Sequence, residues 1–291
     1  MQFRWRSLRF VCSAAGAEGS VYFPPGKASN VLRGALGSTL REVSCVPECA
    51  SARTCARRAE CDYARIFEPV LTEGPSGLQD PPRPFVLRAS HLDGVTAASR
   101  FHFDLHLFVI DHAPVDALTR AIARLAETGL GPGRGLVRLT EVLVSDVREI
   151  ALTPEPGGCA SVTIEFVTPT ELKHEGRVAA RPEFPVLIAR VRDRLGALSR
   201  LYDCGDVALD WTGLVERAQG VRLAEFQADR ASNVTRFSTK TRQTHALGGF
   251  TGRARYEGPV GEFLSLLRAA QYTGVGRQTV WGKGEIRVVV D

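Results

Sequence analysis

The order of secondary-structure elements that the sequence predicts is the same in both halves of this 291-residue chain. In the first half, a strand-like run at residues 3–12 precedes a helical pattern at 31–43, where apolar residues recur three and four positions apart and Ser29 or Asn30 offers an N-cap. Two strand-like runs, a second helix and a last strand complete the order before residue 152. The order β-α-β-β-α-β is typical of the ferredoxin-like fold.

The second half repeats this order. A strand is followed by a helix at 182–202 with apolar residues along one side, and a later helix at 258–273 leads into a closing strand. We therefore predict an α+β protein built from two tandem ferredoxin-like (βαββαβ) domains, at residues 1–152 and 158–291.

The composition permits nucleic-acid binding and argues against a membrane protein. The formal net charge is +5 and the sequence pI is about 8.9, a basic excess that suits a polyanionic partner without requiring one. No apolar run approaches the roughly 18 residues that a membrane helix needs. Arg4, Arg6 and Arg9 interrupt the first apolar stretch, which a signal peptide would keep unbroken. We expect a cytoplasmic protein whose cysteines stay reduced.

A glycine-rich loop, GVGRQTVWGKG at residues 274–284, stands between the last predicted helix and the last strand. Glycine has no Cβ, so the loop backbone could approach a phosphate closely; the same freedom also serves a purely structural turn. Charged residues stand inside the loop as well. We predict that phosphate is contacted by Gly274, Gly276, Arg277, Gly282, Lys283 and Gly284.

This glycine pattern, GxGxxxxxGxG before the final strand, resembles the signature of the RAMP superfamily of CRISPR-associated proteins. Residues 248–288 resemble the C-terminal domain of its pre-crRNA-processing endoribonucleases. Other stretches also resemble that family: LRGALGSTLRE with the cysteines and CDYARIFEP after it, FVTPTELK, PEFPVLIARVRDRL and RFSTKTRQ. The resemblance implies binding of CRISPR repeat RNA and metal-independent cleavage by the ribose 2′-OH, with no cofactor for catalysis.

Two other functions stay open. The chain could be a non-catalytic RAMP subunit that holds guide RNA in an effector complex with other CRISPR subunits, or a structural RNA-binding protein outside CRISPR systems. The glycine-rich loop serves all three functions, whereas the similarity to the processing enzymes favours cleavage.

The catalytic residue that the family leads one to expect is missing. Many members carry a His on or just after the first helix of the N-terminal domain, but no His lies between Val21 and Cys61. Groups able to transfer a proton stand near that location, at a predicted hairpin tip and after a basic run; these candidates are Tyr22, Lys27, His174 and His245. His102 and His106, on one strand face with Asp104, come next.

A basic run in the second half predicts a positive stripe. Arg236, Lys240 and Arg242 alternate at period 2, so they share one face of a strand-like segment. That face could contact RNA phosphate, or it could be a solvated edge strand that deters aggregation.

Four of the seven cysteines lie in one short insert, at residues 45–67 of the first domain. The spacing C-x3-C-x5-C-x5-C is not among the common zinc patterns. Clustered thiols in a reducing compartment still indicate a thiolate-bound structural metal, zinc or an iron–sulfur cluster, with unligated thiols as the alternative. The ligands would be Cys45, Cys49, Cys55 and Cys61.

Overall fold

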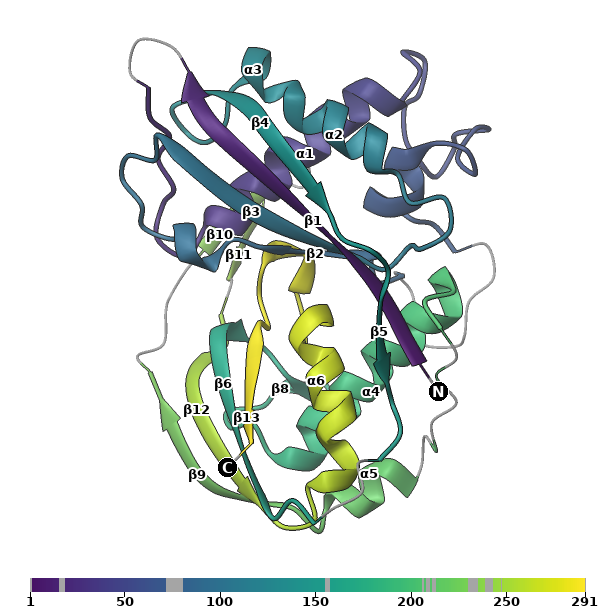
Figure 1. Cartoon of the computed structure of the whole chain (residues 1–291), viewed down its shortest axis with the longest axis vertical. Coiled ribbons are helices and arrows are strands. Elements are labelled where there is room, and N and C mark those ends of the chain that lie inside the picture. Colours follow the sequence, from purple (N-terminus) through teal and green to yellow (C-terminus); the bar gives the residue numbers. More distant parts are fainter. Residues whose placement is uncertain are drawn as a thin grey trace. The chain divides into compact units, whose positions relative to one another are not determined.

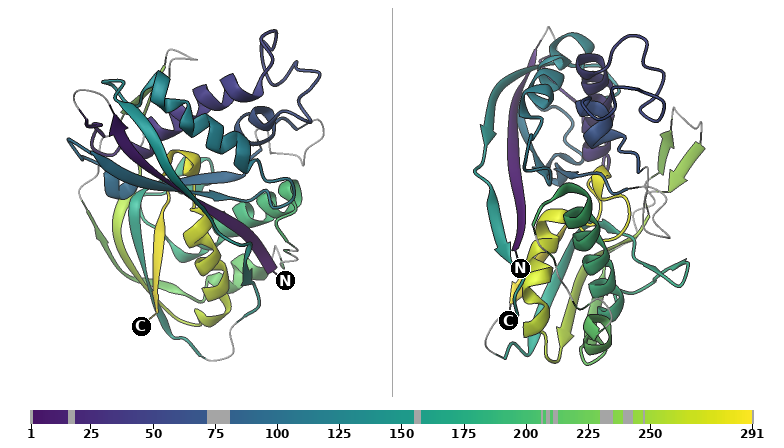
Figure 2. Two further views of the ribbon diagram at one scale, coloured as in Figure 1. Left: turned by 45° about the horizontal axis from the view of Figure 1, so that its top comes forward. Right: turned by 90° about the vertical axis from the view of Figure 1, so that its right-hand side faces the viewer.

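A computed structural model describes most of the chain, which forms two compact units (Figures 1 and 2). The first unit is Trp5–Val147, and the second joins residues 1–4 to Arg148–Asp291. The described residues are 2–15, 19–71, 81–154, 158–205, 207, 210, 213–229, 235–238, 243–246 and 248–290, without the side chains of 235–238 and 243–246.

The first unit contains a four-strand antiparallel path in the order β2-β3-β1-β4. The last strand of the motif therefore lies beside the first, as in a ferredoxin-like fold. Its elements are β1 (Gln2–Ala15), α1 (Ala28–Ser44), the π-helical turn η1 (Tyr63–Phe67), β2 (Phe85–Arg88), η2 (Ser90–Leu92), β3 (Arg100–Leu107), α2 (Val115–Ala123), α3 (Leu125–Thr128) and β4 (Leu136–Val144).

The core of this unit follows from the alternation along β1 and β3. Leu8 pairs with Leu105 and Phe10 with Phe103, and all four side chains are buried. The rings of Phe10 and Phe103 stack at 5.3 Å between centroids. Helices α1 and α2 cover this face of the sheet (Figure 2), because residues two apart on a strand present one continuous apolar surface to them.

Helix α1 begins at Ala28, before both of its predicted caps. The N–H of Ala28 donates to the carboxylate of Asp93 at 2.8 Å, and Ser29 is buried inside the helix. The prediction that Ser29 or Asn30 caps α1 was therefore wrong, because a side chain 65 residues away satisfies the free helix N–H.

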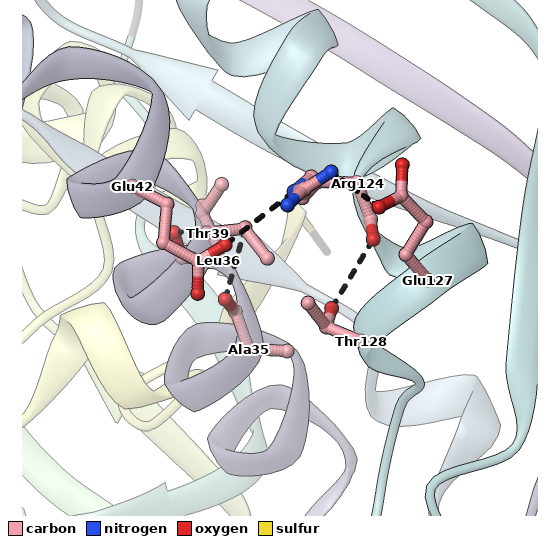
Figure 3. A network of polar contacts seen from close by, with 7 residues as sticks. All are labelled: Ala35, Leu36, Thr39, Glu42, Arg124, Glu127 and Thr128. Carbon is pink, nitrogen blue, oxygen red and sulfur yellow. Dashed lines mark hydrogen bonds and ion pairs between the residues drawn. The ribbon is translucent and has the colours of Figure 1, made fainter.

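Polar contacts at the helix ends join α1 to α3 (Figure 3). The guanidinium of Arg124 pairs with Glu127 and lies 3.5 Å from the carboxylate of Glu42. The hydroxyl of Thr128 donates to the carbonyl of Arg124 at 3.2 Å. These charged side chains are 44–65% exposed, so the pairs orient the helices more than they stabilise them.

The second unit has the same topology, a four-strand antiparallel sheet in the order β13-β6-β12-β9. Two short hairpins, β7–β8 and β10–β11, lie outside this sheet. The elements are β5 (Arg148–Ala151), β6 (Ser161–Thr170), β7 (Lys173–His174), β8 (Arg177–Val178), α4 (Phe184–Tyr202), α5 (Gly213–Ala218), β9 (Arg222–Ala228), β10 (Thr235–Ser238), β11 (Gln243–Ala246), β12 (Phe250–Glu257), η3 (Gly261–Phe263), α6 (Leu264–Thr273), η4 (Thr279–Trp281) and β13 (Ile286–Val290).

Two ferredoxin-like topologies in one chain confirm the predicted fold class. The compact units divide between Val147 and Arg148, whereas the predicted domains divide between 152 and 158. Residues 1–4 group with the second unit, which also contains β5. No helix among the described residues combines the length and the apolar character needed to cross a bilayer.

Candidate functional site

The glycine-rich loop joins α6 to β13, and each of its glycines has a positive φ angle. The values are +71° at Gly274, +78° at Gly276, +75° at Gly282 and +69° at Gly284. L-amino acids with a Cβ rarely adopt this left-handed conformation, so the backbone favours glycine at all four positions.

The missing Cβ atoms of two of these glycines face the protein itself. A Cβ on Gly276 would lie 2.4 Å from the carbonyl oxygen of Glu171, and one on Gly284 would lie 2.0 Å from that of Val275. The N–H groups of Val275 and Arg277 donate to the carbonyls of Gly284 and Glu171, at 2.9 and 3.0 Å. At Gly276 and Gly284 the missing Cβ thus lets the chain approach its own backbone, which is the structural alternative that the sequence left open beside phosphate contact.

The two cations of the loop differ in accessibility. The side chain of Arg277 is 52% exposed and pairs with the carboxylate of Glu171. Lys283 is only 5% exposed. Arg277 is thus the loop cation that a phosphate in solution could reach.

The predicted basic stripe lies largely outside the described residues. Lys240 and Arg242 are not described. Arg236 lies on β10, directly opposite His245 on β11 in the hairpin register. The backbone therefore places a predicted RNA-binding residue and a predicted catalytic residue at paired positions of one hairpin.

His174 stands at the end of the β7–β8 hairpin, as the sequence predicts for a hairpin tip. The turn that follows uses Glu175 and Gly176 at positive φ angles of +48° and +78°. The His174 side chain is 59% exposed, with its Nε2 3.9 Å from the Glu175 carboxylate.

In the first unit, the chain before α1 holds Tyr22 outward. Val21 exchanges backbone hydrogen bonds with Ala98, at 3.0 and 2.9 Å, and the N–H of Phe23 donates to Val95 at 2.9 Å. Val21 and Phe23 are buried, whereas Tyr22 between them is 44% exposed. Lys27 directly precedes α1 and is partly exposed. Both candidates therefore stand on backbone anchored to the segment that follows η2.

The turn η2, directly before that segment, contains a histidine that sequence reasoning did not single out. The ring of His91 stacks on the ring of His102 at 4.6 Å, and its Nε2 lies 3.0 Å from the His102 carbonyl oxygen. His91 is two residues from Asp93, the residue that caps α1. One signal in the sequence could have identified His91: it belongs to a polar stretch, SHLDG at residues 90–94, that closely follows a buried strand.

Electrostatics favour a neutral His102. Burial, followed by the charges of His91 and Arg9, lowers the pKa of His102. The neighbouring Asp104 accepts two hydrogen bonds from Arg9, at 2.7 and 2.8 Å. Burial would raise the pKa of Asp104, but this ion pair outweighs burial and lowers it. Asp104 is therefore engaged with Arg9.

The predicted histidine face is divided in the folded protein. The ring of His106 packs against the ring of Trp5 at 4.8 Å, and Trp5 is buried. His102 instead stacks on His91. The imidazole pair near α1 is thus His91 with His102, because the loop after β2 folds back over β3.

The four clustered cysteines are all unpaired and line one small cavity of about 50 Å³. Burial, followed by the hydrogen bond and charge of Cys61, raises the pKa of Cys45 to about 12. These residues lie beyond the C-terminal end of α1, whereas Tyr22, Lys27 and His91 lie at or near its start.

Comparison with known proteins assigns both halves of the chain. Residues 164–286 match the family model of the CRISPR-associated endoribonuclease Cas6, and residues 3–155 match a model described as an N-terminal domain, AF_1859_N. No curated protein sequence matches the chain.

Solved structures of Cas6 proteins share the fold over nearly the whole chain. A product complex of Cas6 (TTHB231) is 19% identical with a TM-score of 0.60, and a product complex of Cas6 (TTHA0078) is 21% identical with a TM-score of 0.52; each alignment covers 98% of this chain and 99% of the other. Thermus thermophilus Cas6 (TTHB231) is 15% identical with a TM-score of 0.55, covering 99% of both chains. The region that contains the glycine-rich loop, residues 164–286, therefore belongs to the Cas6 family of CRISPR-associated endoribonucleases.

Proposed function

We propose that this protein cleaves CRISPR precursor RNA within its repeats through attack of a ribose 2′-OH on the adjacent phosphorus, without a catalytic metal. The observation that carries this proposal is the Cas6 match over 164–286, which includes the whole glycine-rich loop. The products would be one RNA with a 2′,3′-cyclic phosphate and one with a 5′-OH. The reaction needs a base for the 2′-OH, an acid for the leaving oxygen and positive charge around the phosphorane, and no nucleophilic side chain.

Groups of the first unit fit these roles. Neutral His102, stacked on His91, suits a general base, since a base must be unprotonated at the working pH. Exposed Tyr22 could protonate the leaving oxygen, and Lys27 could stabilise the phosphorane charge. In the second unit His174 and His245 stay as alternative proton-transfer groups, His245 because its hairpin partner is Arg236.

The test is cleavage of the cognate repeat RNA in EDTA and in magnesium, with the product ends analysed. We expect equal single-turnover rates and a 5′ fragment that carries a cyclic phosphate. An RNA with a single 2′-deoxy nucleotide at the mapped cleavage position should bind but not be cut, which serves as the matched control. Loss of cutting in EDTA that magnesium, but not zinc, restores would overturn the mechanism.

A second candidate function rests on a specific departure from the family. Because no His stands between Val21 and Cys61, the chain could be a non-catalytic subunit that holds guide RNA among other CRISPR effector subunits. Tight binding of repeat RNA without cutting, in both EDTA and magnesium, would favour this function over cleavage.

A further inference from the structure

The thiols of the cysteine insert form one connected cluster. The Sγ atoms of Cys45 and Cys61 lie 3.8 Å apart. Cys49, whose thiol donates to the carbonyl of Ser51 at 3.7 Å, and Cys55 line the same cavity as these two. The spacing along the chain is irregular, yet the fold brings all of these thiols to the wall of one cavity of about 50 Å³.

The insert has no hydrophobic core of its own, although the Arg41 side chain of α1 donates to the carbonyls of Cys49 and Ala50 at 3.0 and 3.1 Å. Residues 45–61, all of which the structure describes, contain no helix or strand, and Ala52 is their one buried residue. The turns are local, such as the hydrogen bond from the N–H of Cys49 to the carbonyl of Val46 at 3.0 Å. Loops longer than about 12–15 residues without secondary structure are uncommon in compact domains and are usually functional where they are ordered.

The ends of the insert are tied to packed elements. Cys45 directly follows α1, and the Cys61 thiol donates to the carbonyl of Ser44 at 3.7 Å. After Cys61 comes η1, whose Phe67 ring packs on Gly37 of α1, where a Cβ would lie 2.4 Å from the ring. The cluster therefore stands where the end of α1 meets the start of η1.

We propose that Cys45, Cys49, Cys55 and Cys61 bind one structural Zn²⁺ as four thiolates. In a tetrahedral site with Zn–S distances of about 2.3 Å, sulfur atoms lie about 3.8 Å apart. The Cys45–Cys61 separation of 3.8 Å equals that edge. Binding one Zn²⁺ releases four protons and leaves a site of net charge −2, with no position open for water.

The described residues contain no group of three or more metal-ligand side chains already arranged to hold an ion. The proposal therefore requires the thiols to turn inward. A change of one χ1 rotamer moves a cysteine Sγ by about 3 Å. The cavity favours a single ion, because an iron–sulfur cluster would add several further atoms to a space of about 50 Å³.

Metal analysis of the full-length protein, purified without chelator, tests the proposal. We expect about one zinc per chain in the wild type and a loss of most of it in Cys49→Ser and in Cys55→Ser. Cys159→Ser is the matched control, since Cys159 is also a free, partly exposed thiol but lies outside the cluster. Its zinc content should equal that of the wild type.

Two further measurements keep the test decisive if a variant folds poorly. Cobalt added to chelator-treated wild type should produce the visible absorption of tetrahedral Co²⁺–thiolate, and zinc should restore the thermal transition. Thiol counting after denaturation without reductant should find all seven cysteines free. Five thiols without metal would indicate a disulfide instead, and an iron–sulfur chromophore, or zinc unchanged in Cys49→Ser, would equally overturn the proposal.

Discussion

In both units the last helix, α3 in the first and α6 in the second, ends in a Gly-X-Gly turn. In the first unit Gly129 and Gly131 have φ angles of +74° and +77° and flank buried Leu130; in the second, Gly274 and Gly276 have +71° and +78° and flank buried Val275. Each central residue donates its N–H to a later glycine, Leu130 to Gly135 at 2.8 Å and Val275 to Gly284 at 2.9 Å. The Gly-X-Gly turn is thus common to both helix-to-strand junctions.

What differs is the segment that the turn closes. It comprises residues 131–134 in the first unit and 276–283 in the second, where the longer loop adds η4, Arg277 and Lys283. A feature present in both units reflects the demands of the fold, since the turn must reverse the chain onto its sheet. Residues of this loop that contact RNA, rather than close the turn, are therefore expected within 277–283.

The largest effect should come from adding a Cβ to either turn. Gly284→Ala and Gly129→Ala should each lower the free energy of unfolding by about 2–4 kcal/mol, because the Cβ would lie 2.0 and 2.4 Å from carbonyl oxygens and φ is positive. Denaturant unfolding measures both. Gly133→Ala is the control, with nothing within 4 Å. A Gly284→Ala protein that is stable but no longer binds RNA would contradict a structural role for the turn. It would indicate that this glycine contacts RNA directly.

A loss of about 100-fold is expected for the group that acts as base, the usual scale of general acid–base catalysis. We predict it for His102→Ala in the first unit, measured as single-turnover cleavage with RNA affinity retained. His106→Ala is the matched control, because its ring packs on Trp5 rather than on His91. Normal cutting by His102→Ala, together with loss in His174→Ala or His245→Ala, would move the base to the second unit.

The pH profile should locate the same base. The pKa of His102 is lowered, so the cleavage rate should rise with pH below the ordinary histidine value of about 6.5 and level off above it. Arg9→Met removes a positive charge that lowers this pKa, and the rising limb should shift to higher pH. The lowered pKa of His102 also makes the free energy of unfolding depend on pH. Its contribution is fully present above the pKa of histidine in the unfolded chain and is lost as the pH falls through the lower pKa of the folded protein. A profile unchanged by Arg9→Met would remove His102 from the mechanism.

The smallest effect concerns charge in the longer loop. Arg277→Ala should lower the log–log salt dependence of RNA binding by about one unit at most. Arg134→Ala, an exposed arginine in the shorter loop of the first unit, should leave the slope unchanged. Equal slopes in wild type and Arg277→Ala would show that the longer loop does not contact phosphate through this side chain.

The sequence by itself determined the duplicated fold and the family. The period-2 alternation at 101–107 and the helical spacing at 31–43 are local signals. They predict a strand and a helix without any information about the elements that pack against them. The glycine pattern at 274–284 is also local, since a positive φ angle is a property of one residue.

The tertiary structure decided which side chains meet. Asp93 rather than Ser29 caps α1, His91 rather than His106 stacks on His102, and Lys283 is buried while Arg277 is exposed. The irregularly spaced cysteines likewise gather around one cavity only after α1 and η1 have packed. Periodicity reports which face of an element is buried, but contacts between loops depend on how distant segments pair, and no spacing in the sequence encodes that pairing.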